Sequence, residues 1–314
     1  MTIPVLKLSS GHDIPVIGFG TYAPVNEPGR CYDSVRVALE AGYRHLDCAA
    51  FYLNEIEAGN AIYEFLQANP SVSRRDLFIT TKVWNHLHEP DDVVWSLKKS
   101  LKDLRLDYVD LFLVHWPIAC KRDDKMQPLK GPDGKAVLDE YLTEHQEITW
   151  KAMEGLYEQG LAKSIGVSNW TISGLKELLK HAKVKPSANQ VEVHPFLPNT
   201  ALLNYCKSQD IILEAYTPLG KLSAGERLSA VPELLEIVDR TGFTMAQVLI
   251  AWGVQRGYVV LPKSFTPERI ESNFQLVQLD QQDFEAVNAY ASQQNTRIVN
   301  IAEEYGVDVW ADGE

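Results

Sequence analysis

The chain has 314 residues, of which 45% are hydrophobic and 23% charged, as in an ordinary globular protein. Its 42 acidic and 30 basic residues give a formal net charge of −12, so its surface should repel nucleic acid and anionic membranes. The first residues lack the apolar core of a signal peptide, and no apolar run is long enough to span a bilayer. We therefore expect a soluble, cytoplasmic protein in which a local basic cluster holds any bound phosphate.

The cysteines indicate neither a metal site nor a disulfide framework. Cys31, Cys48, Cys120 and Cys206 lie far apart, with no CxxC pair and no spacing typical of metal ligands. A chain of this length can bury enough apolar surface to be stable without such a cross-link. The sequence thus predicts reduced structural thiols and no bound metal.

Short apolar runs alternate with amphipathic helical patterns along the chain. A hairpin is predicted at residues 5–12, and helical patterns follow at, for example, 32–41, 91–104 and 172–182. Eight apolar runs are predicted to be strands, at 16–20, 45–47, 77–82, 109–115, 162–168, 188–192, 211–216 and 259–262. Nearly continuous apolar strands that alternate with helices indicate a parallel sheet covered by helices.

Two architectures provide such a sheet, and the first strand distinguishes them. A doubly wound dinucleotide-binding sheet carries a glycine-rich first turn, but the turn here reads GFGTY at 18–22, without the third glycine. We therefore predict one (β/α)8 barrel domain over residues 1–314. Long connections at 117–145 and 219–231, and the tail after Asn295, are predicted to overhang its mouth.

Barrel enzymes carry their chemistry at the carboxyl ends of the strands, which share one mouth. Taken alone, each polar residue at such an end has an ordinary explanation, since a carboxylate can cap a turn and a single histidine is more often a core residue. The strand ends are nevertheless rich in polar groups: Asp47 with Tyr52, Lys82, His115, Ser168, Asn169, Gln190, Tyr216, Lys263 and Ser264. Their convergence on one mouth predicts an active site.

Four of these residues suit acid catalysis without a metal. The pKa of a tyrosine is about 10, which is too high for ready proton exchange at neutral pH. The ammonium of Lys82 should lower the pKa of Tyr52, while Asp47 orients Lys82. His115 can bond and polarise a substrate oxygen. The quartet predicts a reductase in which a carbonyl receives hydride from a nicotinamide and a proton from Tyr52.

The motifs that carry these residues resemble those of the aldo-keto reductase family. They read GYRHLD at 42–47, YLNE at 52–55, LVHWP at 113–117, IGVSN at 165–169, NQVE at 189–192, LPKS at 261–264 and PERI at 267–270. With the opening segment they cover the chain from about residue 5 to 295 in the family's order. The resemblance implies a monomeric (β/α)8 barrel with Tyr52 as proton donor, assisted by Asp47, Lys82 and His115.

The resemblance also implies that the cofactor is NADP(H). The nicotinamide would stack on Tyr216, and its amide would be held by Ser168, Asn169 and Gln190. An aromatic face and three amide or hydroxyl groups suit a planar carboxamide. Among the remaining cofactor positions, Leu219 begins a loop that lacks a clear pattern for clamping the pyrophosphate.

A basic cluster at the last strand suits the far end of NADP. Lys263, Ser264 and Arg269 lie at this strand and at the start of the next helix, where two cations and a hydroxyl can bind the 2′-phosphate. Without the family pattern, a solvated basic turn would be the simpler interpretation. Asn273 matches an adenine-binding position of the family, whereas Ser272 stands where many members have Glu.

Aromatic residues are predicted to form an apolar funnel around the substrate: Tyr22, Phe51, Trp84 and Trp116. Tyr22 stands where Trp is common in the family and adds a hydroxyl. Residues 84–90, 121–135 and 296–300 are similar to those of fungal glycerol dehydrogenases and glyceraldehyde reductases. The resemblance therefore suggests glycerol, dihydroxyacetone or glyceraldehyde as substrate, with a broad aldehyde or pentose reductase as the alternative.

Three other functions are compatible with a barrel. A glycoside hydrolase could use Glu192 and Glu214 as its pair of carboxylates. A Schiff-base aldolase could use Lys82, although Asp47 should keep that lysine charged. A regulatory subunit could bind NADP without catalysis, although it would have no reason to keep all four residues of the quartet.

Overall fold

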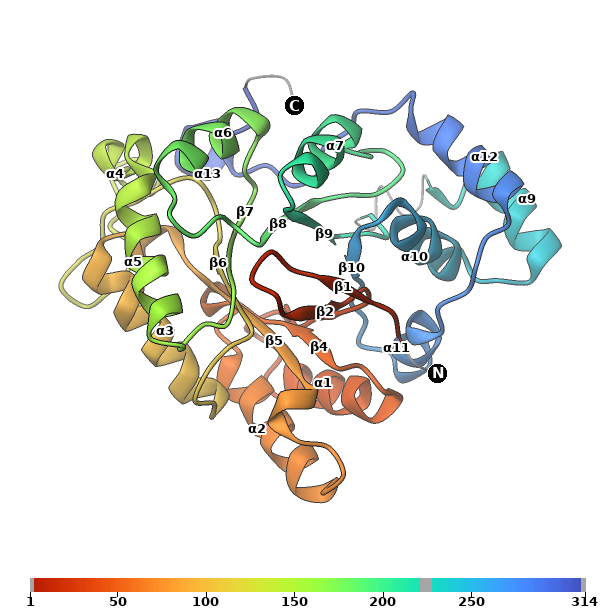
Figure 1. Ribbon diagram of the computed structural model, residues 1–314, viewed down its shortest axis with the longest axis horizontal. Helices are drawn as coiled ribbons and strands as arrows, with labels where there is room; N and C mark the ends of the chain where they lie inside the picture. Colours follow the sequence, from red (N-terminus) through yellow and green to blue (C-terminus); the bar gives the residue numbers. More distant parts are fainter. Residues whose placement is uncertain (1–2, 221–227, 312–314) are drawn as a thin grey trace.

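Eight short parallel strands form a ring in the computed structural model, which describes residues 3–220 and 228–311 (Figure 1). In chain order the strands are β3 (Phe19–Gly20), β4 (His45–Asp47), β5 (Phe78–Val83), β6 (Leu111–Val114), β7 (Ile165–Ser168), β8 (Ala188–Glu192), β9 (Ile212–Tyr216) and β10 (Val259–Leu261). Each strand pairs with the next one in the sequence. The (β/α)8 barrel predicted from the sequence is confirmed.

The ring closes between its first and last strands. Ile17 forms a parallel bridge with Val260, the Gly18 N–H donates to the Val260 carbonyl at 2.9 Å, and the Val260 N–H donates to the Val16 carbonyl at 2.8 Å. The backbone at Gly18 must approach its neighbours closely, because a Cβ there would lie 2.6 Å from His45 Nδ1. Glycine therefore permits both the closure and the buried imidazole beside it.

Helices surround the ring (Figure 1). They are α1 (Arg30–Ala41), α2 (Glu55–Ala68), α3 (Pro90–Leu104), α4 (Glu140–Glu144), α5 (Gln146–Glu158), α6 (Ile172–His181), α7 (Thr200–Ser208), α9 (Pro232–Thr241), α10 (Met245–Arg256), α11 (Pro267–Phe274), α12 (Gln281–Ala291) and α13 (Ala302–Tyr305), with 3-10 turns η1 (Ala50–Tyr52), η2 (Arg74–Asp76) and η3 (Asn85–Leu87). Within the described residues, no helix has both the length and the apolar character needed to cross a membrane.

The N-terminal hairpin, β1 (Val5–Lys7) and β2 (Asp13–Pro15), covers one end of the barrel (Figure 1). Leu8 and Ile14 of this segment are at most 2% exposed and pack against strand side chains such as Leu111 and Val259. A separate, larger core lies between the strands and the helices. Because the hairpin closes this end, the carboxyl ends of the strands form the accessible mouth.

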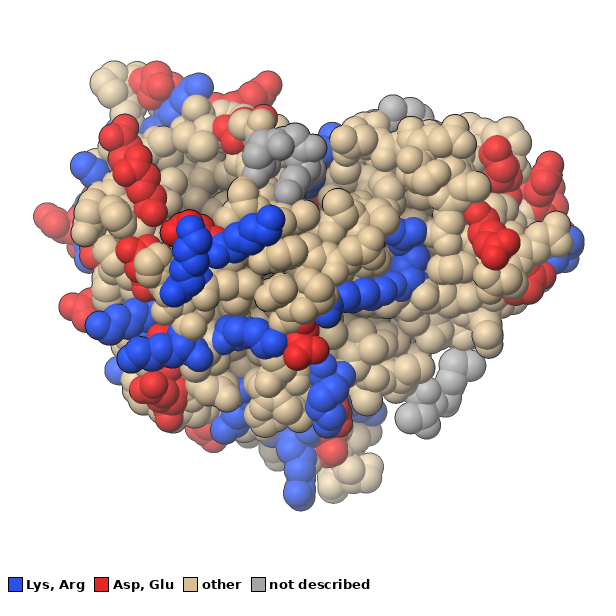
Figure 2. Space-filling view, turned by 45° about the horizontal axis from the view of Figure 1, so that its top comes forward, with Lys and Arg blue, Asp and Glu red and all other residues tan. Residues whose placement is uncertain are grey.

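Lys and Arg side chains run across the side of the molecule seen in Figure 2. Two lysines of the described chain meet helix ends. Lys207 donates to the carbonyl of Arg256, the last residue of α10, at 2.8 Å, and Lys185 donates to the carbonyl of Gln209, just beyond α7, at 2.7 Å. Cations are favoured there because the backbone dipole makes the C-terminal end of a helix negative. These two lysines thus have a structural role at helix ends, and Lys185 also pairs with Asp210 at 3.3 Å.

The 117–145 connection and the C-terminal tail lie at the opposite end of the barrel, as predicted. In residues 117–145 the Cys120 N–H donates to the Asn85 carbonyl at 2.8 Å, just beyond the carboxyl end of β5. In the C-terminal tail the Thr296 N–H donates to the Phe196 carbonyl at 2.7 Å, beyond the end of β8. Most of the predicted 219–231 loop, residues 221–227, lies outside the described residues.

Candidate active site

Three of the predicted catalytic side chains are in direct contact at the mouth. Lys82 Nζ lies 2.6 Å from Asp47 Oδ1 and 3.3 Å from Tyr52 Oη, and it also donates to the Cys48 carbonyl at 3.0 Å. Lys82 is 0% exposed and Asp47 is 3% exposed. Asp47 ends β4, Lys82 lies near the end of β5, and Tyr52 ends the turn η1 between β4 and α2. Neighbouring parallel strands thus bring the ammonium and the carboxylate together.

The segment that carries Tyr52 is attached on two sides. Asn54 Nδ2 donates to the carbonyl of Thr21, next to β3, at 2.9 Å. On the other side, the buried carboxylate of Glu55 accepts from Thr81 Oγ1 at 2.6 Å and from Ser100 Oγ at 2.8 Å. Thr81 precedes Lys82 in β5, so this bond links the start of α2 to the strand that carries the ammonium.

The pKa of Tyr52 differs from the sequence-based prediction. Burial raises the pKa of the Tyr52 phenol to about 12, and the nearby Lys82 ammonium lowers it only in part. The predicted net decrease was therefore wrong, because the loss of solvation outweighs the attraction of the cation. Burial by itself lowers the pKa of Lys82, but the Asp47 carboxylate and the Tyr52 phenol together raise it above its ordinary value. The site thus holds a protonated phenol beside an ammonium.

His115 contributes a neutral imidazole to the same place. It is 8% exposed, and burial together with the charge of Lys82 keeps its pKa well below the usual range. Its ring centroid lies 6.0 Å from that of Tyr52 and 4.8 Å from that of Trp84. Its Nδ1 is buried without a hydrogen-bond partner in the described part of the chain. The remaining ring nitrogen is the one that can bond a substrate oxygen.

The residues predicted to hold a nicotinamide form one network of hydrogen bonds. Tyr216 Oη donates to Asn169 Oδ1 at 2.8 Å, and Asn169 Nδ2 donates to the His115 carbonyl at 2.9 Å and to Ser168 Oγ at 3.1 Å. Ser168 Oγ donates to the Gln190 carbonyl at 2.7 Å. An aromatic ring flanked by hydroxyl and amide groups fits a planar carboxamide, so the donor set is compatible with a nicotinamide.

The predicted phosphate-binding residues lie around the end of β10 and the start of α11. Lys263 and Arg269 are exposed, Ser264 Oγ accepts from the Thr266 N–H at 3.1 Å, and Asn273 is buried. Lys263 Nζ lies 5.6 Å from the ring centroid of Tyr22, whose ring contacts that of Tyr52 at 5.4 Å between centroids. The last predicted cofactor residue, Leu219, is half-buried after β9. This cation cluster thus borders the same mouth.

Arg30 adds a cation that sequence reasoning missed. Its guanidinium lies 4.1 Å from the centroid of the Phe265 ring, and Lys263 Nζ lies 4.3 Å from the same centroid. Although the Lys263 side chain is exposed as a whole, partial desolvation of its ammonium and the charge of Arg30 lower its pKa. Because α1 and α11 are distant in the sequence, no local pattern at residue 30 could have indicated this proximity.

Three of the four predicted substrate-pocket residues surround Tyr52 and His115. Phe51 and Trp84 are stacked, with centroids 3.7 Å apart and an angle of 16° between their planes. Phe51 and Tyr22 are 42% and 48% exposed, whereas Trp84 is 7% exposed. Trp116 is 4% exposed and makes no ring contact with the other three among the described side chains. Tyr22, Phe51 and Trp84 are therefore the predicted funnel residues whose rings contact Tyr52 or His115 in the described chain.

The two carboxylates of the hydrolase alternative do not form a catalytic pair. Both Glu192 and Glu214 are 0% exposed. Glu192 accepts from His194 Nε2 at 2.7 Å and from the N–H groups of Ile298 and Val299 at 2.9 and 2.8 Å, so it holds the C-terminal tail. Glu214 lies inside the barrel beside Gln190. Neither carboxylate can reach a glycosidic bond.

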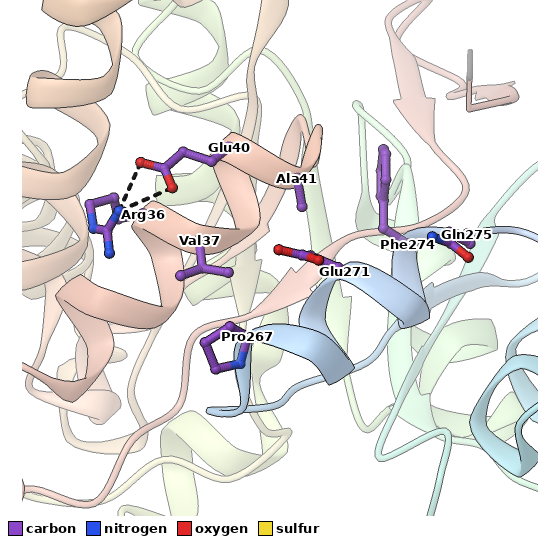
Figure 3. A pocket seen from close by; sticks show the side chains of 8 residues that line it. All are labelled: Arg36, Val37, Glu40, Ala41, Pro267, Glu271, Phe274 and Gln275. Atoms are coloured by element: carbon purple, nitrogen blue, oxygen red, sulfur yellow. Dashed lines mark hydrogen bonds and ion pairs between the residues drawn. The ribbon is translucent and has the colours of Figure 1, made fainter.

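Other features do not suggest a different centre. A groove of about 600 Å³ lies between α1 and α11, where Arg36 and Glu40 form an ion pair and Phe274 closes one side (Figure 3). None of the site residues predicted from the sequence lines it. In the described ranges, no three His, Cys, Asp or Glu side chains are grouped so that they could hold a metal ion. The mouth of the barrel therefore remains the candidate site.

Known proteins are similar to this one along nearly the whole chain. Residues 16–292 match the Aldo/keto reductase family. Glycerol 2-dehydrogenase (NADP(+)) of Hypocrea jecorina is 54% identical over 318 residues, which cover 100% of both chains. The protein of the same name from Saccharomyces cerevisiae is 42% identical, covering 94% of this chain and 93% of that protein. The structure of the aldose reductase from Schistosoma japonicum superposes with a TM-score of 0.88, at 39% identity and 97% coverage of both chains.

Proposed function

Because the chain belongs to the aldo/keto reductase family, we propose that it uses NADP(H) to reduce small aldehydes or ketones and to oxidise the corresponding alcohols. The observation that carries the proposal is the contact of Tyr52 Oη with Lys82 Nζ, at 3.3 Å, beside the 2.6 Å pair of Lys82 and Asp47. NADPH supplies the hydride in such a reaction. The side chains of this barrel supply the proton and position the carbonyl.

Each residue of the quartet has one task. Tyr52 donates its proton to the carbonyl oxygen, and a phenol with a pKa of about 12 carries that proton throughout the neutral range. The ammonium of Lys82 stabilises the phenolate that remains, and Asp47 holds the ammonium in place. His115, which is neutral, bonds the same carbonyl oxygen and aligns it with Tyr52. This division of tasks requires no metal.

The cofactor residues are proposed from the donor set at the mouth. Tyr216 provides an aromatic face for the nicotinamide, while Ser168, Asn169 and Gln190 surround its carboxamide. Lys263, Ser264 and Arg269 hold the 2′-phosphate, where two cations and a hydroxyl provide the required charge. Leu219 and Asn273 complete the set on the pyrophosphate and adenine sides.

We propose that the substrate is a small polyol or its carbonyl form, namely glycerol, dihydroxyacetone or glyceraldehyde. The stacked rings of Phe51 and Trp84 narrow the approach to Tyr52, which favours small molecules. Tyr22 adds an exposed hydroxyl that can bond a polar substrate. The full-length similarity to a glycerol 2-dehydrogenase supports this choice over a broad aldehyde or pentose reductase.

The chain is further proposed to act as one domain over residues 1–314 and as a cytoplasmic monomer. All site residues come from one chain, so catalysis does not require a partner subunit. Its four cysteines are buried free thiols, as suits a reducing compartment. The raised pKa of Lys82 argues against a Schiff-base aldolase, which needs a neutral amine. The contacts within the quartet argue against a regulatory subunit without catalysis.

The test is the oxidation of NADPH by the purified chain with glyceraldehyde, dihydroxyacetone, pentoses and aromatic aldehydes, and the reduction of NADP⁺ with glycerol. We expect the highest kcat/KM for the three-carbon compounds and much lower rates with NADH. A better rate with pentoses or aromatic aldehydes would support the alternative reductase. No turnover with any carbonyl compound would refute the proposed function.

A further inference from the structure

A line of hydrogen bonds crosses the barrel interior and ends at a carboxyl group that has no task in the proposed chemistry. Lys82 Nζ contacts Tyr52 Oη and Asp47 Oδ1. The same Asp47 oxygen accepts from Gln190 Nε2 at 2.9 Å, and Gln190 Nε2 also donates to Glu214 Oε2 at 2.8 Å. Glu214 is 0% exposed and is the Cα partner of Gln190 in the ladder between β8 and β9. Its hydrogen-bonded connection to the site therefore runs through Gln190.

The two carboxyl groups determine how the amide of Gln190 is oriented. A primary amide has two N–H donors on nitrogen and an acceptor on oxygen. Both donors of Gln190 are used, one by Asp47 and one by Glu214. Turning the amide by 180° would place its oxygen against the Asp47 carboxylate, and the hydrogen bond between Gln190 Nε2 and Asp47 Oδ1 would be lost. Only the carbonyl oxygen Oε1 is then left to meet a ligand.

Asp47 alone would not hold this orientation as firmly. Its Oδ1 already accepts a hydrogen bond from Lys82. If Gln190 bonded only to Asp47, the second N–H of its buried amide would have no acceptor. Glu214 provides that second acceptor. Burial and the charge of Asp47 raise the pKa of Glu214 to about 8, so at neutral pH its carboxyl group is mostly protonated. A protonated carboxyl still accepts through Oε2, and the interior then carries one cation and one anion.

We propose that Glu214 is a positioning residue that acts through Gln190. With Asp47, it holds both N–H groups of Gln190 inside the barrel, so that Gln190 presents only its carbonyl oxygen to the cofactor. That oxygen accepts an N–H of the nicotinamide carboxamide and helps to fix the plane of the ring. The inference rests on the proposed function, because it assumes a nicotinamide at this mouth.

The test compares two ligands that differ in the nicotinamide half. In Glu214→Leu the new side chain has a volume similar to that of Glu but no atom that can accept a hydrogen bond from Gln190. The dissociation constants of this variant for NADPH and for 2′,5′-ADP are measured by titration calorimetry. We expect Glu214→Leu to bind NADPH about tenfold more weakly, the loss typical of one hydrogen bond. Its affinity for 2′,5′-ADP should stay as in the unmodified chain, because that ligand lacks the nicotinamide. Glu214→Gln, which keeps an acceptor oxygen, should bind both ligands normally.

A matched control removes a buried carboxylate that does not touch Gln190. Glu55 is 4% exposed and bonds Thr81 and Ser100 on the outer side of the barrel. Glu55→Leu should leave the ratio of the dissociation constants of NADPH and 2′,5′-ADP as in the unmodified chain. The same change of that ratio in Glu55→Leu as in Glu214→Leu would show that removing any buried carboxylate has this effect, and would overturn the assignment to Glu214.

A double substitution tests whether Glu214 acts through Gln190. The double variant, which carries both Gln190→Leu and Glu214→Leu, should bind NADPH no more weakly than the single variant Gln190→Leu, because Glu214 has no further effect once Gln190 is absent. Additive losses, an unchanged affinity in Glu214→Leu, or equal weakening of both ligands would each overturn the proposal. If Glu214→Leu does not fold, Glu214→Thr, whose side chain ends one bond beyond Cβ, takes its place with the same expected ratio. Turnover by the unmodified chain tests the proposed function separately.

Discussion

Glu192 accepts a hydrogen bond from His194 Nε2 at 2.7 Å, and neither side chain is exposed to solvent. The same carboxylate accepts from two consecutive backbone N–H groups, those of Ile298 and Val299. One buried group at the end of β8 therefore anchors the C-terminal tail over the mouth. Because the acceptors are concentrated on a single carboxylate, its removal leaves several buried donors without partners.

Replacement of Glu192 should destabilise the chain and loosen its tail. We expect Glu192→Ala to lower the free energy of unfolding by about 3 kcal/mol or more, because a buried imidazole and two N–H groups lose their acceptor. Urea denaturation measures the loss, and limited proteolysis should cut the tail first. The control is Glu177→Gln on the surface of α6, where the side chain is 61% exposed and a change below about 1 kcal/mol is expected. Equal effects of both substitutions would contradict the anchor.

Removal of the Tyr52 hydroxyl should abolish most of the reduction of carbonyl compounds. Tyr52→Phe lacks the transferable proton, and general acid catalysis typically contributes about 10²- to 10⁴-fold. We expect kcat to fall by that range, while the dissociation constant of NADPH changes little. Tyr63→Phe, at an exposed tyrosine of α2, is the matched control and should keep full activity. Unchanged turnover in Tyr52→Phe would refute the assignment of the proton donor.

The basic cluster should distinguish NADPH from NADH. Lys263→Ala or Arg269→Ala removes a cation proposed to bind the 2′-phosphate, and a charge-assisted hydrogen bond is worth about 1.5–3 kcal/mol. We expect NADPH to bind roughly 10- to 100-fold more weakly, with little change for NADH. Lys180→Ala, at an exposed position of α6, should affect neither cofactor. Equal losses for both cofactors would argue against a phosphate site.

Buried histidines should make the chain sensitive to acid. His88 is 1% exposed, and burial together with nearby His86 lowers its pKa to about 3. An unfolded histidine has a pKa of about 6.5, so the unfolded chain binds a proton that the folded chain does not as the pH falls. The contribution of neutral His88 to the free energy of unfolding is therefore complete above about pH 6.5. Below that pH it decreases by up to about 1.4 kcal/mol per pH unit, until the pKa of His88 in the folded chain is reached.

Urea unfolding of the chain and of His88→Asn at several pH values between 7 and 4 isolates this effect. Other groups, including Glu214 with its raised pKa, titrate in the same range, but they are common to both proteins. We expect the free energy of unfolding to fall less steeply with decreasing pH in His88→Asn. Parallel slopes would mean that His88 is not buried as a neutral group.

The stacked pair at the mouth should limit substrate size. Phe51→Ala removes the ring that lies 3.7 Å from that of Trp84 and widens the approach to Tyr52. We expect kcat/KM for aromatic aldehydes to rise by about tenfold, while that for glyceraldehyde falls or stays constant. Leu53→Ala, at a neighbouring side chain that is 80% exposed, should not change the preference. An unaltered preference in Phe51→Ala would exclude a role in specificity.

Much of the site could be predicted because a parallel barrel gathers its strand ends. Asp47, Lys82 and His115 lie at or near the ends of apolar runs, and Tyr52 follows the first of these by five positions in the printed sequence. The alternation of short apolar runs with amphipathic helical patterns is visible in the local sequence. It therefore predicted the strands, the helices and the closed barrel. The family motifs then indicated which of these polar groups belong together.

The sequence by itself thus determined the barrel, the family and the residue types at the mouth. Only the tertiary structure decided the pKa of Tyr52, because desolvation depends on everything that packs around its hydroxyl. It also decided the partners of Gln190 and Glu192, since Asp47 is 143 positions from Gln190 and Ile298 is 106 positions from Glu192. Local patterns cannot encode such contacts: they exist only when the closed ring brings distant strands within hydrogen-bonding distance.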